Sequence, residues 1–509
     1  MKEKIQVFMA LFMASTLFAN AGGYLTNTNH NIAFNRNFAR VGTIGIDGVY
    51  SNPAGVAFLD KGFHLSLNFQ NVYQTRIIKS SITIPALSST PFGSPFKLNS
   101  GDSNGRKEYI GKAAVPILPS LQLAKNYDKW GFQLAFGVFG GGGKASFNSG
   151  LPSFERLISL LPMQLNAKGI LTTTPGYSFS SYIAGQQYNF GLQLGATYKL
   201  NDHLAVYGGA RFNYISNRYE GNIVDITANI AGTNQRLYDY FSDQSIGLNN
   251  IIINLKSKSS EVTDPNVKSK LEAKIKTLEE NLQDIEKTKE QVKDKYLECT
   301  QRGWGVTPII GIDYRVGKLN FGARYEFTTR LNIENDTKRD DTGMFKNGVN
   351  TPNDLPGIFA IGTQYSLLDN LRLMASFHYY FDKDARMAND KQKLIKNNTC
   401  EYLAGVEWDV LPTVTLSMGG QATRYGLGDG KYLSDLSFVT SSCSLGFGAK
   451  VKVAKNIDVN AAYFFTNYEK FTKNYNSTLP TPKGNLKINN SDEFTRTNKV
   501  LGVGVDINF

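Results

Sequence analysis

From residue 62 to its end, the chain alternates apolar and polar residues over stretches of about ten positions. In the stretch 318–334, for example, Leu319, Phe321, Ala323 and Tyr325 stand at odd positions with polar residues or glycine between them. Successive side chains of a β-strand point to opposite faces, so one face of each stretch is apolar. This alternation is typical of a membrane β-barrel, where the apolar face contacts lipid and the other face lines a lumen.

The number and spacing of these stretches predict how the barrel closes. Fourteen strands are expected, an even number that lets antiparallel strands close with both ends on one side. Short connections follow every even strand and long loops follow every odd strand. A soluble β-sandwich or propeller could also alternate, but neither explains this parity or the terminal Phe509, which barrel assembly machinery typically recognises. The expected strands are 62–78, 108–125, 129–145, 186–200, 204–218, 302–316, 318–334, 356–368, 371–383, 398–411, 413–426, 436–453, 457–470 and 495–509.

The fold class predicted is therefore an all-β membrane protein, a 14-stranded antiparallel transmembrane β-barrel over 62–509 with two added segments. Residues 22–61 lack alternation and are expected to form an N-terminal plug (hatch) domain in the lumen. Residues 219–301 are expected to form an extracellular helical hairpin insertion. There Asp264 is a candidate N-cap before Pro265, and apolar residues follow at spacings of three and four, typical of a coiled coil.

The first residues are typical of an export signal. Lys2 and Lys4 precede an apolar run, and Ala19-Asn20-Ala21 provides small residues for cleavage, so 1–21 is predicted to be a signal peptide. No later run reaches the roughly 18 apolar residues of a membrane helix. Composition agrees with β-structure, because only 19% of the residues are charged while Gly (48), Phe (32) and Tyr (26) are abundant. We expect a multi-pass barrel in the outer membrane of a Gram-negative cell.

Candidate chemistry is sparse. The three cysteines and four histidines are scattered and form no HExxH or CxxC pattern, so no disulfide framework, metal site, cofactor or catalytic residue is expected. No nucleophile motif lies near a histidine, which argues against an enzyme. The net charge of +12 (55 − 43) is spread along the chain and suits an anionic lipopolysaccharide surface better than nucleic acid. We expect a monomer within outer-membrane lipid.

One motif within 22–61 is specific. Arg40-Val41-Gly42-Thr43-Ile44 and Asp47 lead into Ser51-Asn52-Pro53-Ala54-Gly55. With the strand count, this segment resembles the outer-membrane transporters of long-chain fatty acids and other hydrophobic compounds (FadL/TodX type). The resemblance implies passive entry of a hydrophobic ligand from outside, passage by the plug, and sideways exit beside a kinked third strand. It also implies a functional plug motif at Asn52, Pro53, Ala54 and Gly55; the alternative is an ordinary Asn-Pro turn.

The sequence itself predicts a weak place in the wall. Gly140-Gly141-Gly142-Gly143 interrupts the third strand, and its hairpin neighbour carries Pro116 and Pro119, which cannot donate a ladder hydrogen bond. A lateral opening is expected there; the alternative is a simple bulge at the outer rim. The glycine run does not match a phosphate loop, because Gly143-Lys144 is followed by Ala145.

Four arginines fall on predicted inward positions and are candidates to hold a ligand carboxylate: Arg211, Arg324, Arg330 and Arg372. The alternative, which we favour for each one alone, is that they pair with Glu326, Asp458 or plug residues. The predicted function is uptake of a hydrophobic small molecule, with long-chain fatty acids as the default. A barrel-anchored adhesin or receptor acting through 219–301, and haem or aromatic hydrocarbon uptake, remain alternatives.

Overall fold

The computed structural model describes residues 26–167, 175–481 and 484–509, so the predicted signal peptide (1–21) lies outside the described residues. It confirms a closed antiparallel barrel of fourteen strands, in which the last strand pairs with the first from His64 opposite Asn508 onward. The strands are β1 (Gly62–Thr83), β2 (Arg106–Asn126), β3 (Trp130–Phe147), β4 (Tyr177–Lys199), β5 (Leu204–Ile230), β7 (Lys295–Val316), β8 with β9 (Leu319–Glu326, Asn332–Asp340), β10 with β11 (Asn350–Pro352, Ile358–Leu368), β12 (Leu371–Tyr380), β13 (Asn397–Leu411), β14 (Val414–Gly426), β15 (Ser442–Ala454), β16 with β17 (Ile457–Tyr468, Phe471–Thr481) and β18 (Gly484–Asn508).

The short connections of the barrel all gather at one end, as the parity predicts. Connections after even strands are short, at 127–129, 200–203, 317–318, 369–370, 412–413 and 455–456, and define the short-turn end. The opposite end carries the longer loops and is called the long-loop end. The connection after strand thirteen differs from the prediction, because β17 and β18 stay paired out to Thr481 opposite Gly484 where a long loop was expected. Strand seven departs from the predicted continuous stretch 318–334: it divides into β8 and β9, and each part pairs with a different region of β7. Cys400 on β13 and Cys443 on β15 are separated by β14 and are free, as the strand assignment predicts.

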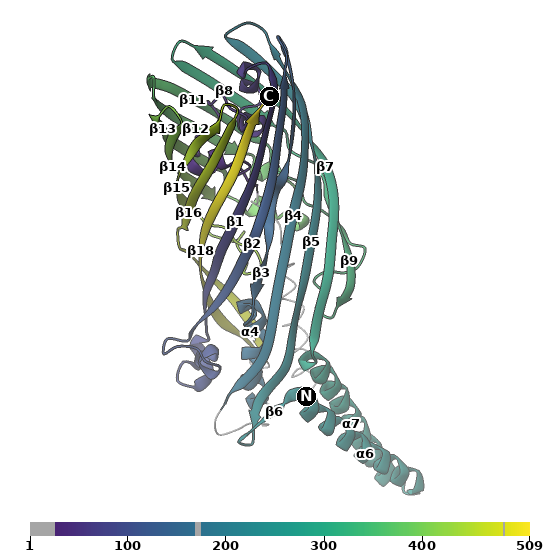
Figure 1. Ribbon diagram of the computed structural model, residues 1–509. Helices are drawn as coiled ribbons and strands as arrows, with labels where there is room; N and C mark the ends of the chain where they lie inside the picture. Colours follow the sequence, from purple (N-terminus) through teal and green to yellow (C-terminus); the bar gives the residue numbers. More distant parts are fainter. Residues whose placement is uncertain (1–25, 168–174, 482–483) are drawn as a thin grey trace.

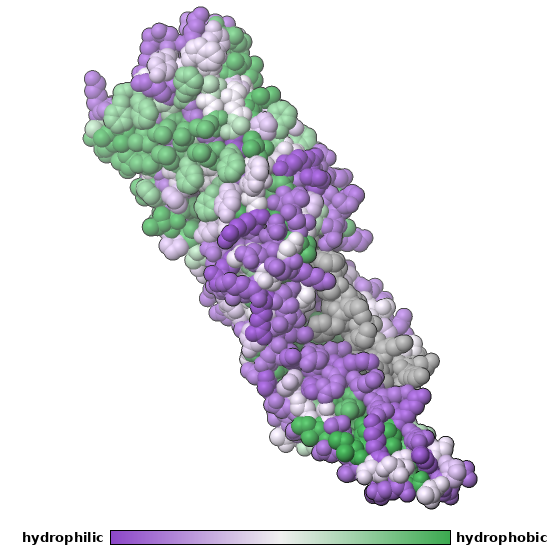
Figure 2. All heavy atoms as spheres, turned by 90° about the vertical axis from the view of Figure 1, so that its right-hand side faces the viewer, coloured by the Kyte–Doolittle hydropathy of each residue, from purple (hydrophilic) through white to green (hydrophobic). Residues whose placement is uncertain are grey.

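The wall is taller on one side than on the other (Figure 1). β5 has 27 residues, which at roughly 3.3 Å per residue gives about 90 Å, far more than an apolar belt of about 25 Å. Its outward side chains are apolar at Phe212 and Tyr214 but charged at Arg218 and Glu220, nearer the long-loop end. Figure 2 shows the same division, with hydrophobic side chains gathered toward one end and hydrophilic ones covering the rest. Lipid therefore surrounds only the short-turn part of the tall strands.

The insertion between β5 and β7 is a helical hairpin. After β6 (Thr233–Arg236), α6 (Leu237–Glu261) and α7 (Pro265–Val292) pack together and project from the long-loop end (Figure 1). The Asp264 side chain accepts the Asn266 N–H at 2.8 Å, which is the N-cap predicted from the sequence. The hairpin is shorter than the expected 219–301, because β5 and β7 stay paired out to Ile223 and Lys295. Those strand ends are polar on their outward face, so their alternation gives no apolar signal.

None of the helices in the described ranges is long and apolar enough to cross a membrane.

Shorter helices fill the long-loop end. The loop after β1 holds η3 (Pro85–Leu87), η4 (Pro91–Gly93) and η5 (Pro95–Leu98); the loop after β3 holds α4 (Pro152–Ser159) and α5 (Leu161–Ala167); the loop after β12 holds η6 (Asp382–Asp384) and η7 (Ala388–Leu394). Glu155 of α4 is fully buried and accepts hydrogen bonds from Tyr109 Oη at 2.7 Å and Tyr177 Oη at 2.9 Å. These bonds fix α4 between β2 and β4.

Residues 26–61, here called the N-terminal segment, lie inside the barrel (Figure 1). They contain α2 (Ile32–Arg36), α3 (Gly48–Ser51) and η2 (Gly55–Phe58). Asn31 caps α2 by accepting the Ala33 N–H at 2.8 Å, and its amide also donates to Gln122 of β2 at 2.7 Å. Hydrogen bonds of this kind reach strands on several sides of the lumen, so polar side chains of the segment are satisfied by the inner face of the wall.

Candidate functional site

The ladder between β2 and β3 is interrupted. Pairing stops after Ala114 opposite Lys144 and resumes at Leu121 opposite Phe136, which leaves 115–120 of β2 and 137–143 of β3 unpaired with each other. We call these residues the β2–β3 gap; they include Pro116, Pro119 and the glycine run. On the other side of β2, Leu118 faces Gln70 of β1, next to the outward-facing Phe69. The gap therefore lies at the level of the lipid-facing side chains.

The glycine run bends β3 without ending it, which differs from the expectation that the strand breaks off there. β3 continues to Phe147 and stays paired with β4, with bulges after Val138 and after Gly141. Gly141 and Gly142 have φ of 71° and 121°, which residues with a Cβ rarely adopt. The bulges turn β3 away from β2 while its bonds to β4 persist.

The N-terminal segment covers the β2–β3 gap from inside. The Asn27 amide donates to the carbonyl oxygens of Val138 at 3.0 Å and Gly141 at 2.9 Å, and the Asn27 N–H donates to Phe139 O at 2.9 Å. His30 stacks on the Phe139 ring at 4.1 Å between ring centroids. Unpaired backbone groups are costly at membrane depth. Asn27 therefore replaces hydrogen bonds that β2 would otherwise supply.

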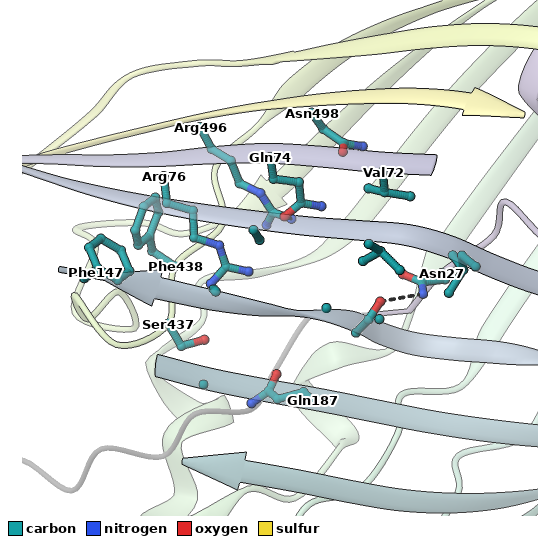
Figure 3. A pocket seen from close by; sticks show the side chains of 18 of the residues that line it. Asn27, Val72, Gln74, Arg76, Phe147, Gln187, Ser437, Phe438, Arg496 and Asn498 are labelled. Atoms are coloured by element: carbon teal, nitrogen blue, oxygen red, sulfur yellow. Dashed lines mark hydrogen bonds between the residues drawn. The ribbon is translucent and has the colours of Figure 1, made fainter. Parts of the chain in front are cut away.

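A cavity of about 160 Å³ adjoins the gap. Val115, Leu118 and Gly141 to Gly143 contribute gap residues to its lining, and Val72, Phe464 and Val500 add apolar surface. Figure 3 shows Arg76 of β1 and Arg496 of β18 reaching into this pocket beside Gln74. The pocket thus combines an apolar wall with a basic end.

The motif at Asn52 fixes the N-terminal segment to the wall. The Asn52 amide donates to Asp313 of β7 at 2.5 Å and to Thr43 O at 3.1 Å, while its oxygen accepts the Gly55 N–H at 3.2 Å. Gln133 of β3 donates to Pro53 O at 2.7 Å. A Cβ on Gly55 would lie 2.4 Å from the Asn52 amide nitrogen, so a larger residue there would displace the amide from its hydrogen bonds.

Ala54 is fully buried in this motif and packs with Tyr207 and Ile309 of the wall. The motif therefore contacts three strands of the tall wall, namely β3, β5 and β7.

A buried ion-pair cluster anchors the same segment to the opposite, shorter wall. Glu407 of β13 accepts hydrogen bonds from Arg36 and Arg40, each at 2.9 Å, and Arg40 also pairs with Asp47 at 2.7 Å. The side chains of Arg36 and Glu407 are only 3% and 9% exposed. Removing one partner from such a cluster leaves an uncompensated buried charge, which typically costs about 3–5 kcal/mol.

All four arginines predicted from the sequence have a carboxylate partner inside the protein. Arg211 and Arg324 both pair with the buried Glu326. The Arg372 guanidinium contacts both oxygens of Asp409, at 2.6 and 2.7 Å.

Arg330 lies between β8 and β9, with its side chain 54% exposed, and pairs with Asp354 at 2.6 Å. None of the four lines the pocket beside the β2–β3 gap.

Sequence reasoning missed Arg76, Arg496 and Asn27. Both arginines stand at inward positions of predicted strands, so parity alone would have included them. Their proximity follows from the register in which the first strand pairs with the last, and the sequence does not reveal that register. Asn27 gave no signal, because its role depends on carbonyl groups more than 100 residues away. The described part of the chain contains no group of three His, Cys, Asp or Glu side chains placed to hold a metal ion.

Comparisons with known proteins show which solved structures share this fold. No protein-family model and no curated protein matches the sequence. Among solved structures, the chain is similar to a Pseudomonas aeruginosa FadL homologue, with 12% identity, a TM-score of 0.56 and coverage of 96% of this chain and 100% of that one. A mutant of the monoaromatic hydrocarbon channel TodX gives 13% identity, a TM-score of 0.50 and coverage of 96% and 99%. The Pseudomonas putida toluene transporter TodX gives 13% identity, a TM-score of 0.48 and coverage of 91% of this chain and 94% of that one. The first two likenesses show that this chain has the fold of FadL-type barrels.

Proposed function

We propose that this protein is a passive outer-membrane transporter of hydrophobic small molecules, with long-chain fatty acids as the default ligand. The observation that carries the proposal is the pocket on the lumen side of the barrel wall, which is lined by residues from both sides of the β2–β3 gap. A cavity with an apolar wall that adjoins an unpaired stretch of the barrel at lipid depth suits a ligand that ends in the membrane. The solved structures of the same fold include proteins described as a FadL homologue and a monoaromatic hydrocarbon channel.

The route we propose begins at the long-loop end and ends sideways at the β2–β3 gap. The N-terminal segment acts as a plug that blocks the straight path, because it bonds to strands on several sides of the lumen. The Asn52 motif keeps its shape, and Asn27 closes the gap until a ligand displaces it. The concentration gradient of the ligand drives transport, so no energy source is required.

The test compares two tryptophan substitutions on β2. Leu118 faces the pocket and is 7% exposed, whereas Leu123 faces outward in the paired part of the ladder, opposite Leu134. We expect Leu118→Trp to fill the pocket at the gap and to lower uptake of radiolabelled hexadecanoate severalfold. Leu123→Trp should transport normally at the same surface level. Equal uptake by Leu118→Trp and the unchanged protein would contradict the lateral route.

Aromatic hydrocarbons are a second candidate ligand, because one structure of the same fold is described as a monoaromatic hydrocarbon channel. Uptake of labelled toluene, measured beside uptake of hexadecanoate in the unchanged protein and the same two variants, distinguishes this ligand from fatty acids. Uptake of toluene without uptake of hexadecanoate would favour the second candidate.

A further inference from the structure

Two arginines face each other directly in the pocket. Arg76 of β1 and Arg496 of β18 are register partners, and both line the pocket (Figure 3). Like charges placed directly opposite each other on neighbouring strands destabilise a sheet. The barrel therefore bears a cost at this position when the pocket is empty, and an anion between the guanidinium groups would remove that cost.

The described residues supply no counter-charge for this pair. Neither arginine lies within 4 Å of a described carboxylate, whereas Arg36 and Arg211, elsewhere in the lumen, each do. Arg496 is 6% exposed and donates to Gln74 Oε1 at 2.7 Å. A buried cation normally has a charged or hydrogen-bonding partner.

We propose that Arg76 and Arg496 form an anion site for the headgroup of the transported amphiphile, and that the site prefers a headgroup with two negative charges. A monoalkyl phosphate is the ligand class that fits. Its tetrahedral oxygens accept hydrogen bonds from two guanidinium groups at once, and its charge of about −2 above pH 7 balances both. A single carboxylate neutralises only one. This inference rests on the proposed transport function and defines its ligand class further.

The rest of the pocket supports an alkyl chain attached to that headgroup. Val72 and Val500 lie on the same two strands as the arginines, four residues away on each, and Leu118 lies across the pocket on β2. All three are buried and apolar. A ligand whose headgroup lies between the arginines would therefore place its chain along apolar side chains that lead to the β2–β3 gap.

The experiment measures direct binding to the purified full-length barrel in non-ionic detergent at pH 8. Dodecyl phosphate, dodecanoate and dodecan-1-ol serve as probes with the same chain length and charges of about −2, −1 and 0. Isothermal titration is performed on the unchanged protein, on Arg76→Gln and on Arg496→Gln. Arg302→Gln is the control, because Arg302 is exposed on β7 away from the pocket.

We expect the unchanged protein and Arg302→Gln to bind dodecyl phosphate roughly tenfold or more tightly than dodecanoate. The phosphate can make charge-assisted hydrogen bonds to both arginines, and one additional bond of this kind changes the affinity by about that factor. Each pocket variant should lose this preference while binding dodecan-1-ol as before. Arg76→Gln should also resist heat at least as well as the unchanged protein, because the like-charge opposition is gone. Arg76→Lys and Arg496→Lys keep the charge and should keep the preference for phosphate.

Three results would overturn the inference. They are equal affinity for the phosphate and the carboxylate, a preference for phosphate that persists in both glutamine variants, and a loss of heat resistance in Arg76→Gln. The last result is expected if Arg76 only stabilises the barrel. Failure of the transport proposal is distinguishable. In that case, vesicles containing the barrel would take up neither dodecanoate nor dodecyl phosphate, although the binding preference remains.

Discussion

Asn27→Ala tests whether the N-terminal segment keeps the β2–β3 gap closed. The substitution removes two side-chain hydrogen bonds, to Val138 O and Gly141 O, and keeps the backbone bond to Phe139 O. A neutral hydrogen bond contributes about 0.5–1.5 kcal/mol, so closure should weaken by about 1–3 kcal/mol. The open population should then rise roughly 5- to 150-fold.

The assay is amide hydrogen exchange in lipid nanodiscs, followed by mass spectrometry. Peptides covering 137–147 should exchange faster in Asn27→Ala, while peptides from the paired part of β3 near Phe132 should not change. Asn29→Ala is the matched control. Asn29 belongs to the same segment and lines the same pocket, but its amide donates to Gln70 of β1 at 2.8 Å and not to a carbonyl group of β3.

Two outcomes would refute the reasoning. If exchange over 137–147 is unchanged in Asn27→Ala, the side chain does not hold the gap. If Asn29→Ala accelerates exchange there to the same extent, any loosening of the segment has this effect and the specific bonds do not matter. Initial uptake of hexadecanoate, measured on the same variants, then tells whether closure limits transport.

Three further predictions follow from other parts of the molecule. Asn52→Ala combined with Pro53→Ala should leave a heat-resistant barrel but lower fatty-acid uptake severalfold at matched surface expression, because the wall ladder remains while the segment loses its bond to Asp313; unchanged uptake would reduce the motif to a structural turn. Replacing 237–292 with a short turn should preserve uptake, since β5 and β7 pair independently of the hairpin, whereas loss of cell-surface binding would favour an adhesin. Burial raises the pKa of Asp382, in the loop after β12, from 3.8 to about 7. Protonation therefore favours the folded form, so heat resistance should fall as the pH rises from about 4 to 7, and Asp382→Asn should abolish that fall.

The alternation of apolar and polar side chains in the sequence is sufficient to predict much of the fold. A period of two is a local property of the chain, so the approximate strand positions, the count of fourteen and the placement of the short connections follow from it. The N-cap at Asp264 is local as well and was predicted correctly. The strand ends near Ile223 and Lys295 were missed, because there the outward face meets water and carries no apolar signal.

The contents of the lumen were decided only by the tertiary structure. Parity places Arg211 or Arg76 inside but does not say which carboxylate lies opposite, since partners come from strands far apart in the sequence. Glu326 neutralises Arg211 and Arg324, whereas the closing pair β1 and β18 brings Arg76 against Arg496. The glycine and proline positions indicated where the wall is weak, yet the covering bonds of Asn27 depend on the path of the segment inside the barrel. Such contacts are set by register and closure, which are properties of the whole ring of strands.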